Sequence, residues 1–131
     1  MTNPQPLPAN FRLLRLELAR EPHHPEGDAQ DSYRLVLPLR PDGYIDVAAW
    51  RAQPSACRVV RESPEGETSI GHLQCEADGR WVVQYEKGQP ELYDDVGFRF
   101  DAERFVPGEY VSISRRDGDH TFRVVSQQPI R

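Results

Sequence analysis

The sequence predicts an all-β protein, either a small antiparallel barrel or a sandwich of about eight strands, with one short helix. Apolar residues recur at every second position in segments such as "RLLRLELA" at 12–19 and "YRLVLPL" at 33–39. This alternation is typical of strands that bury one face. Turn-forming residues separate such segments at short intervals, as expected for an antiparallel all-β domain, and a helix is expected only near 46–53.

The length of 131 residues suits a single domain with its own core. Alternating prolines near the start predict a flexible arm over 1–10. We expect one all-β domain over 11–126 and a short frayed tail over 127–131. We find no internal repeat and no linker between domains.

The charge balance argues against several kinds of partner. The formal net charge is −5, from 21 acidic and 16 basic residues, and Lys87 is the single lysine. Nucleic-acid binding relies on clustered Lys and Arg that neutralise phosphates, so we expect neither nucleic acid nor an acidic membrane as partner. The start has no signal-peptide pattern, and no apolar run approaches the ~18 residues of a membrane span. We therefore expect a cytoplasmic protein with reduced cysteines.

In chain order, the first strand at 12–19 places Leu14, Leu16 and Leu18 on one face. The stretch "REPHHPEGDAQDS" at 20–32 is rich in Pro, Gly and Asp and is predicted to be a long surface loop. A second strand follows at 33–39, and then a turn at "RPDG", in which Pro presets φ and Gly accepts a positive φ.

Asp46 is positioned to cap the short helix "VAAWRAQ", which must stop before Pro54. Farther on, "SIGHLQCEADGRWVVQYE" predicts two strands around the three-residue loop "ADG", with Gly79 left-handed. This register places Cys75 opposite Trp81, Leu73 opposite Val83 and Gly71 opposite Tyr85. A two-residue loop would mix the two faces, so the longer loop is preferred.

The preceding strand, "ACRVVRE", is expected to pair back with Glu62 opposite Ile70. Cys57 would then lie opposite Cys75 on the inner face. A disulfide between directly opposed strands strains the bridge, so buried reduced thiols are favoured. A zinc site is not favoured, because the spacing is not CxxC and His72 faces away.

The segment "GEYVSISRRDGDHTFRVV" at 108–125 predicts a hairpin that turns at Asp117–Gly118. This turn pairs Arg116 with Asp119 as an ion pair and Arg115 with His120. Its apolar side chains then share one face: Val111, Ile113, Phe122 and Val124. A metal site at Asp117, Asp119 and His120 is the alternative, but successive strand residues point to opposite faces. His120 is expected to be an exposed histidine at the rim of the apolar face.

Six residues are candidates for ligand binding, because they are aromatic residues of predicted strands or lie at the hairpin rim: Trp81, Tyr85, Phe98, Phe100, Arg115 and His120. Phe98 and Phe100 belong to an alternating strand at 96–101. The acidic stretch with Glu91, Asp94 and Asp95 beside Tyr93 is expected to be a solvated loop.

No phosphate-binding glycine loop, GxSxG or HExxH motif occurs, so we nominate no catalytic residue, metal ligand or cofactor. His23–His24 could bind a metal nonspecifically in the long loop.

Three segments, "WRAQPSACRVVR", "GRWVVQY" and "GEYVSISRRDGDHTFRVV", give the chain after its proline-rich arm a distinctive overall pattern. In this pattern the chain resembles a group of small bacterial proteins of unassigned function. The resemblance implies a free-standing, single-domain bacterial protein. It carries over no catalytic residue.

Three functions follow as hypotheses. The first is a non-catalytic binding module that meets a protein or small-molecule partner through its loops or a sheet face. The second is a ligand-carrying barrel, in which Phe122 joins the aromatic candidates as a cavity lining. The third is a small enzyme that uses Arg115, His120 and the 91–95 loop. The sequence leaves open whether the chain is a monomer or a homodimer.

Overall fold

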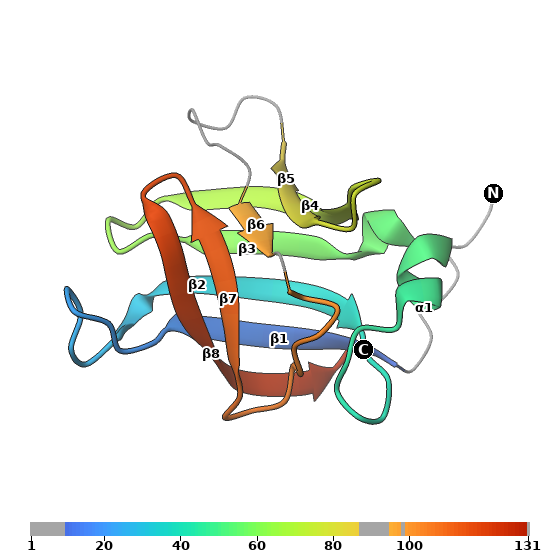
Figure 1. The fold of residues 1–131 in the computed structure, drawn as a ribbon, viewed down its shortest axis with the longest axis horizontal. Coiled ribbons are helices and arrows are strands. Elements are labelled where there is room, and N and C mark those ends of the chain that lie inside the picture. The colour runs from blue at the N-terminus through green and yellow to red at the C-terminus, as the bar shows by residue number, and fades with distance from the viewer. Residues whose placement is uncertain (1–9, 87–94, 98, 131) are drawn as a thin grey trace.

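The computed structural model describes residues 10–86, 95–97 and 99–130, and it forms a closed antiparallel barrel (Figure 1). Each strand pairs with the next along the chain, and the last strand pairs with the first. The strands are β1 (Phe11–Leu18), β2 (Asp28–Pro38), β3 (Arg58–Glu62), β4 (Thr68–Cys75), β5 (Trp81–Tyr85), β6 (Asp95–Gly97), β7 (Tyr110–Arg115) and β8 (Gly118–Pro129). The helix α1 (Val47–Ala52) and a 3-10 turn, η1 (Pro54–Ala56), lie between β2 and β3. The predicted all-β fold with one short helix is confirmed.

Alternating strand directions divide the connections between two ends of the barrel. One end, which we call the apolar end, carries the 39–57 connection with α1, the β4–β5 turn and residues 99–109 before β7. The other end, the polar end, carries the 19–27 loop, the β3–β4 turn and the β7–β8 turn. The β5–β6 connection, 87–94, lies outside the described residues.

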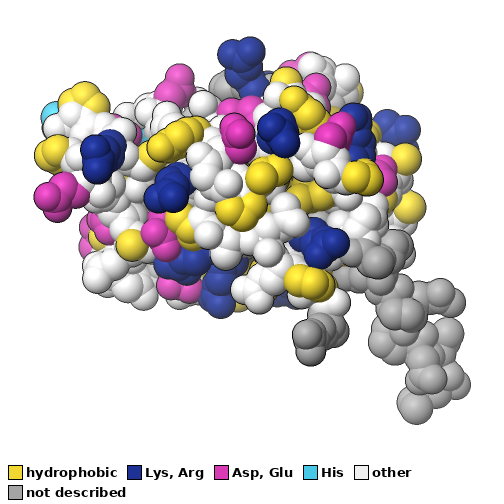
Figure 2. Space-filling model, turned by 90° about the horizontal axis from the view of Figure 1, so that it is seen from below, with side chains coloured by type: hydrophobic (Ala, Val, Ile, Leu, Met, Phe, Trp, Pro, Cys, Tyr) yellow, Lys and Arg dark blue, Asp and Glu magenta, His cyan; other side chains and the backbone are white. Residues whose placement is uncertain are grey.

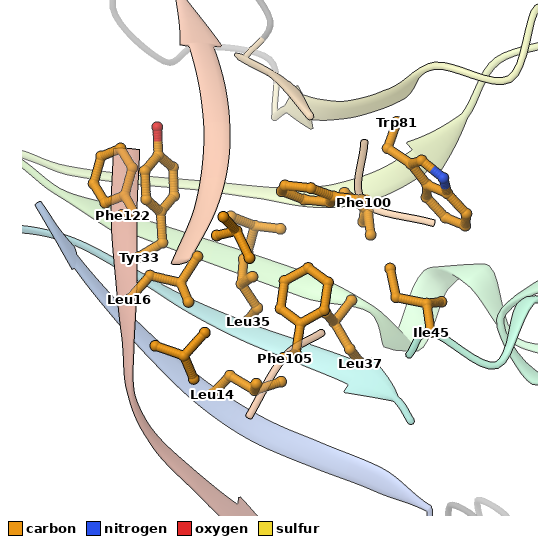
Figure 3. Close-up of a cluster of buried hydrophobic side chains, with 14 of the residues drawn as sticks. Leu14, Leu16, Tyr33, Leu35, Leu37, Ile45, Trp81, Phe100, Phe105 and Phe122 are labelled. Atoms are coloured by element: carbon orange, nitrogen blue, oxygen red, sulfur yellow. The ribbon is translucent and has the colours of Figure 1, made fainter. Parts of the chain in front are cut away.

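Inward-facing side chains fill the barrel with a continuous apolar core (Figure 3). At the apolar end the rings of Trp50 and Trp81 meet edge to face at 5.0 Å, and the Trp50 indole donates to the Leu73 carbonyl at 3.1 Å. The rings of Phe100 and Phe105 meet at 5.2 Å. Trp81, Phe100 and Phe105 are fully buried, and each contributes roughly 1.5–3 kcal/mol through removal from water. The apolar end is therefore closed by hydrophobic packing.

Several local predictions are confirmed. Asp46 caps α1, since its carboxylate accepts a hydrogen bond from the Ala49 amide at 3.0 Å. In the β4–β5 hairpin, Cys75 lies opposite Trp81 and Leu73 opposite Val83, as the three-residue loop requires. The Glu76 amide donates to the Arg80 carbonyl at 2.8 Å to close that loop.

The β3–β4 register differs from the prediction by two residues. Glu62 lies opposite Thr68 rather than Ile70. The turn is tighter than expected, because the Ser63 amide donates to the Glu67 carbonyl at 2.9 Å and Gly66 adopts φ +89°. The Leu73 amide donates to the Cys57 carbonyl, so Cys57 is not opposite Cys75, and both cysteines are free thiols.

The register predicted for the β7–β8 hairpin is also wrong by two residues. Arg115 pairs with Gly118, so the turn lies at Arg116–Asp117 and not at Asp117–Gly118. Ser114, rather than Arg116, stands opposite Asp119 and donates its hydroxyl to that carboxylate. A slip of two residues leaves every side chain on the same face, so the alternation of the sequence cannot detect it. The predicted apolar face is buried as expected.

Three element boundaries also differ. β2 begins at Asp28, so the second part of the predicted 20–32 loop is strand, and it buries Asp31. β8 continues to Pro129, opposite Arg12, so the predicted tail over 127–131 is largely paired. β6 ends at Gly97, and Phe100 lies in a turn rather than in the predicted 96–101 strand.

Candidate binding site

The inner wall of the polar end contains polar side chains where the rest of the barrel is apolar. Tyr33 on β2 lies opposite Arg61 on β3, and Arg61 lies opposite Ser69 on β4. Arg61 follows the buried Val59 by two positions, so strand alternation directs it inward as well. Directly opposed residues have Cβ atoms about 4.5–5.5 Å apart. These three residues therefore form a row across three neighbouring strands.

A buried carboxylate faces this row from the other side of the lumen. Asp95, at the start of β6, is only 2% exposed. Its Oδ2 accepts hydrogen bonds from the hydroxyls of Tyr33 at 2.5 Å and Tyr85 at 2.6 Å. The predicted solvated acidic loop is thus wrong for Asp95, because two phenols satisfy the carboxylate inside the barrel. Glu91, Tyr93 and Asp94 lie outside the described residues.

The two phenols remain protonated in this setting. Burial raises the pKa of Tyr33 well above its ordinary value, and the neighbouring charge of Asp95 raises it further. Burial likewise raises the pKa of Tyr85, with contributions from Tyr33 and Asp95. Both hydroxyls therefore serve as hydrogen-bond donors to Asp95 throughout the neutral pH range.

A buried ion pair spans the lumen beside these phenols. The Arg115 guanidinium donates to both oxygens of Asp31, at 3.0 and 2.7 Å, and the side chains are 7% and 10% exposed. The same guanidinium lies 4.8 Å from the Phe122 ring centroid and 5.5 Å from that of Tyr33. Figure 3 shows those two rings side by side at one end of the core. Arg115 thus links β7 to β2 across the polar end.

Two guanidinium nitrogens at this end lack a partner. The Nε atoms of Arg61 and Arg115 are buried and have no hydrogen-bond acceptor within the described part of the chain. Arg61 also takes part in none of the ion pairs formed among the described residues. An unsatisfied buried donor costs about 1–3 kcal/mol. The polar end therefore holds hydrogen-bonding capacity that these residues leave unused.

His120 links the 19–27 loop to the β7–β8 turn at the mouth of the polar end. Its Nδ1 lies 3.1 Å from both Glu21 carboxylate oxygens, and its Nε2 lies 2.8 Å from Asp117 Oδ1. The side chain is 16% exposed, so it lies at the rim as predicted but is held rather than exposed. Burial opposes its charge, but the hydrogen bonds from Asp117 and Glu21 outweigh that effect and raise the pKa of His120.

The outer wall beside the same loop carries a groove of about 600 Å³. It is lined by outward residues of β1, β7 and β8, among them Glu17, Tyr110 and Arg123, and by residues of the 19–29 segment. Tyr110 is 57% exposed, which is unusual for a large aromatic side chain. Glu17, Tyr110 and Arg123 alternate with inward-facing core residues, so the groove opens on the outer wall of the barrel.

Five of the six predicted ligand-binding residues are described, and they are divided between the two ends. Trp81 and Phe100 belong to the core near α1, whereas Tyr85, Arg115 and His120 lie at the polar end. Phe98 lies outside the described residues.

Sequence reasoning missed three residues of the polar cluster, Asp31, Tyr33 and Arg61, and assigned a fourth, Asp95, to a solvated loop. Arg61 could have been found, because it is a charged residue at an inward position in the alternation of Cys57 and Val59. The other three needed the closure of the barrel.

Comparison of the chain with protein-family models, curated proteins and solved structures gives no match. The resemblance to small bacterial proteins therefore stays a prediction. Among the described residues, no helix is long and apolar enough to cross a bilayer, and no three His, Cys, Asp or Glu side chains group as metal ligands. On the face drawn in Figure 2, basic and acidic side chains are interspersed rather than gathered by sign.

Proposed function

We propose that the protein is a non-catalytic ligand-binding barrel that takes up a small molecule at its polar end. The observation that carries the proposal is the pair of buried arginine Nε atoms without acceptors, on Arg61 and Arg115. Natural interiors leave few polar groups unsatisfied, and a group left in this way calls for an explanation. A bound ligand with an acceptor group supplies one. The interior of an eight-stranded barrel is either filled by side chains or able to hold one small ligand.

The chemistry of the cluster favours binding over catalysis. At the apolar end, burial raises the pKa of Cys57 to about 12, so its thiol is a poor nucleophile. Both ring nitrogens of His120 are engaged by carboxylates, so the imidazole has no free nitrogen to act as a base. The phenols are donors to Asp95. These groups can position and recognise a ligand, but they do not pair a nucleophile with an adjacent base.

Native mass spectrometry tests this function. We would incubate untagged protein with a bacterial small-molecule extract and compare its native mass with its denatured mass. We expect an adduct that survives in Arg58→Met, a change to an exposed arginine of the same strand, and is lost in Arg61→Met. A native mass equal to the bare chain, or an adduct kept equally by both variants, would overturn the proposal.

A protein-binding function is the second candidate, and the exposed Tyr110 in the outer groove favours it. Tyrosine and arginine, here Tyr110 and Arg123, are the residue types enriched where interfaces concentrate their binding energy. A photo-crosslinking side chain at position 110 would label a protein partner, and the same group at the exposed Gln84 on β5 is the control. Labelling at both positions, or at neither, contradicts this candidate.

A further inference from the structure

The unpaired guanidinium also points to the class of ligand. We propose that the ligand carries a single carboxylate, which binds Arg61 at the polar end of the barrel. This inference rests on the proposed function and makes it more specific. Its starting point is the row formed by Tyr33, Arg61 and Ser69 on three neighbouring strands.

The hydrogen bonds of the cluster leave Arg61 as the available cation. Asp31 is engaged on both oxygens by Arg115, so the charge of Arg115 already has a carboxylate partner. Asp95 receives both phenol hydroxyls on one oxygen. Arg61 has neither an ion-pair partner nor an acceptor for Nε among the described residues, and its side chain is only partly buried. Part of its side chain is therefore accessible to solvent.

Guanidinium geometry favours a carboxylate as the missing partner. The planar fork of arginine presents parallel N–H donors that match two carboxylate oxygens. The opposite residue, Ser69, faces inward beside Arg61 and can add a hydroxyl donor. The two phenols cannot serve the same anion, because they already donate to Asp95.

The surrounding charges favour a monoanion over a dianion. Asp95 lies in the same end of the lumen and is bound by two neutral phenols, so its charge repels a second negative charge on a ligand. Asp95 and Arg61 act on the same two phenols, with opposite effects on the pKa of each. One uncommitted positive charge therefore faces a lumen that already holds two carboxylates.

Titration followed by amide and arginine side-chain NMR tests the inference. The probes are acetate, butyrate, octanoate and benzoate at millimolar concentration, each compared with its neutral amide at constant ionic strength. We expect at least one acid to shift the Arg61 Nε–H signal and the β3 and β4 amides, and its amide to leave them unchanged. The Arg61→Gln variant should lose at least tenfold in affinity, while Arg58→Gln, on the same strand but exposed, keeps it.

The outcomes separate this inference from the proposed function. If amides bind as well as acids, or if inorganic phosphate binds more tightly than every acid, the carboxylate assignment fails and the binding barrel stands. If none of the probes shifts polar-end signals, the assignment also fails, whereas an adduct in the mass measurement would still support the barrel. Arg61→Lys keeps the charge without the fork and provides a second, folded variant, for which we expect intermediate affinity.

Discussion

The two ends of the barrel are closed by opposite means. At the apolar end, α1 packs its Trp50 against Trp81, and Phe100 packs against Phe105, so closure relies on hydrophobic burial. At the polar end, closure relies on the Arg115–Asp31 pair and on His120 between two carboxylates. Figure 1 shows α1 at one end of the barrel and the β1–β2 and β3–β4 connections at the other.

The two kinds of closure differ in how much they stabilise the fold. Apolar packing stabilises the fold without leaving polar groups to satisfy. Buried ion pairs often stabilise less than hydrophobic residues of the same volume, because both charges lose their hydration. Buried ion pairs depart from the apolar composition that is expected of a protein core. Such departures are expected at functional sites.

The largest expected effect comes from breaking the buried ion pair. Asp31→Ala leaves the Arg115 guanidinium buried without its carboxylate, so we expect a loss of about 3–5 kcal/mol in the free energy of unfolding. Urea denaturation with linear extrapolation measures it. The matched control is Glu62→Ala, which breaks the exposed Arg34–Glu62 pair and should change stability by about 0–1 kcal/mol.

The double variant Asp31→Leu with Arg115→Met sharpens the contrast between the ends. It removes both buried charges, so most of the lost stability should return. At the apolar end, Trp81→Ala should cost a similar 3–5 kcal/mol or so by leaving a cavity. Equal, small losses for Asp31→Ala and Glu62→Ala would show that the polar end is not held by its ion pair.

The next effect concerns the phenols of the polar end. Tyr33→Phe and Tyr85→Phe each remove one donor from the buried Asp95 carboxylate, and each should cost about 1–3 kcal/mol. In a double-mutant cycle the two losses should not add, because both hydroxyls bind the same oxygen. Strict additivity in thermal or urea unfolding would mean that Asp95 is satisfied independently by each phenol.

A smaller effect is expected at the cap of α1. Asp46→Ala removes the acceptor for the Ala49 amide, and we expect a loss of about 1 kcal/mol. Asp46→Asn keeps an acceptor and serves as the control. Because α1 closes the apolar end, this change should leave ligand adducts at the polar end unaltered, as native mass spectrometry would show. An adduct lost in Asp46→Ala but kept in Asp46→Asn would mean that the two ends are coupled.

The sequence predicted the fold where local chemistry decides it. Period-two alternation identified the strands. Residue types identified the turn at "RPDG" and the helix cap at Asp46. The "ADG" loop set a register that the structure confirms. The predicted register failed by two residues at β3–β4 and β7–β8, because such slips keep each face intact. The polar cluster was not predicted from the sequence, for a different reason. Asp31, Asp95 and Arg115 are far apart in the chain and meet only because the barrel closes.

The smallest effect we predict is a pH dependence at the mouth of the polar end. His120 faces Glu21 from the 19–27 loop and Asp117 from the β7–β8 turn, with Arg115 also nearby. The pKa of His120 is raised in the folded state, so its contribution to stability is fully present below the unfolded value of about 6.5. That contribution is lost as pH rises through the folded pKa.

The contribution of Asp117 to stability has the opposite dependence on pH. Its hydrogen bond with His120 lowers the pKa of Asp117, so its contribution is present above an unfolded value of about 3.9 and is lost on acidification. The link between the two connections is therefore strongest between these limits. Unfolding free energies of wild type and His120→Gln, compared at about pH 5.5 and pH 8.5, measure it. The difference between the proteins should shrink at the higher pH; a constant difference would mean that His120 contributes by packing and not by charge.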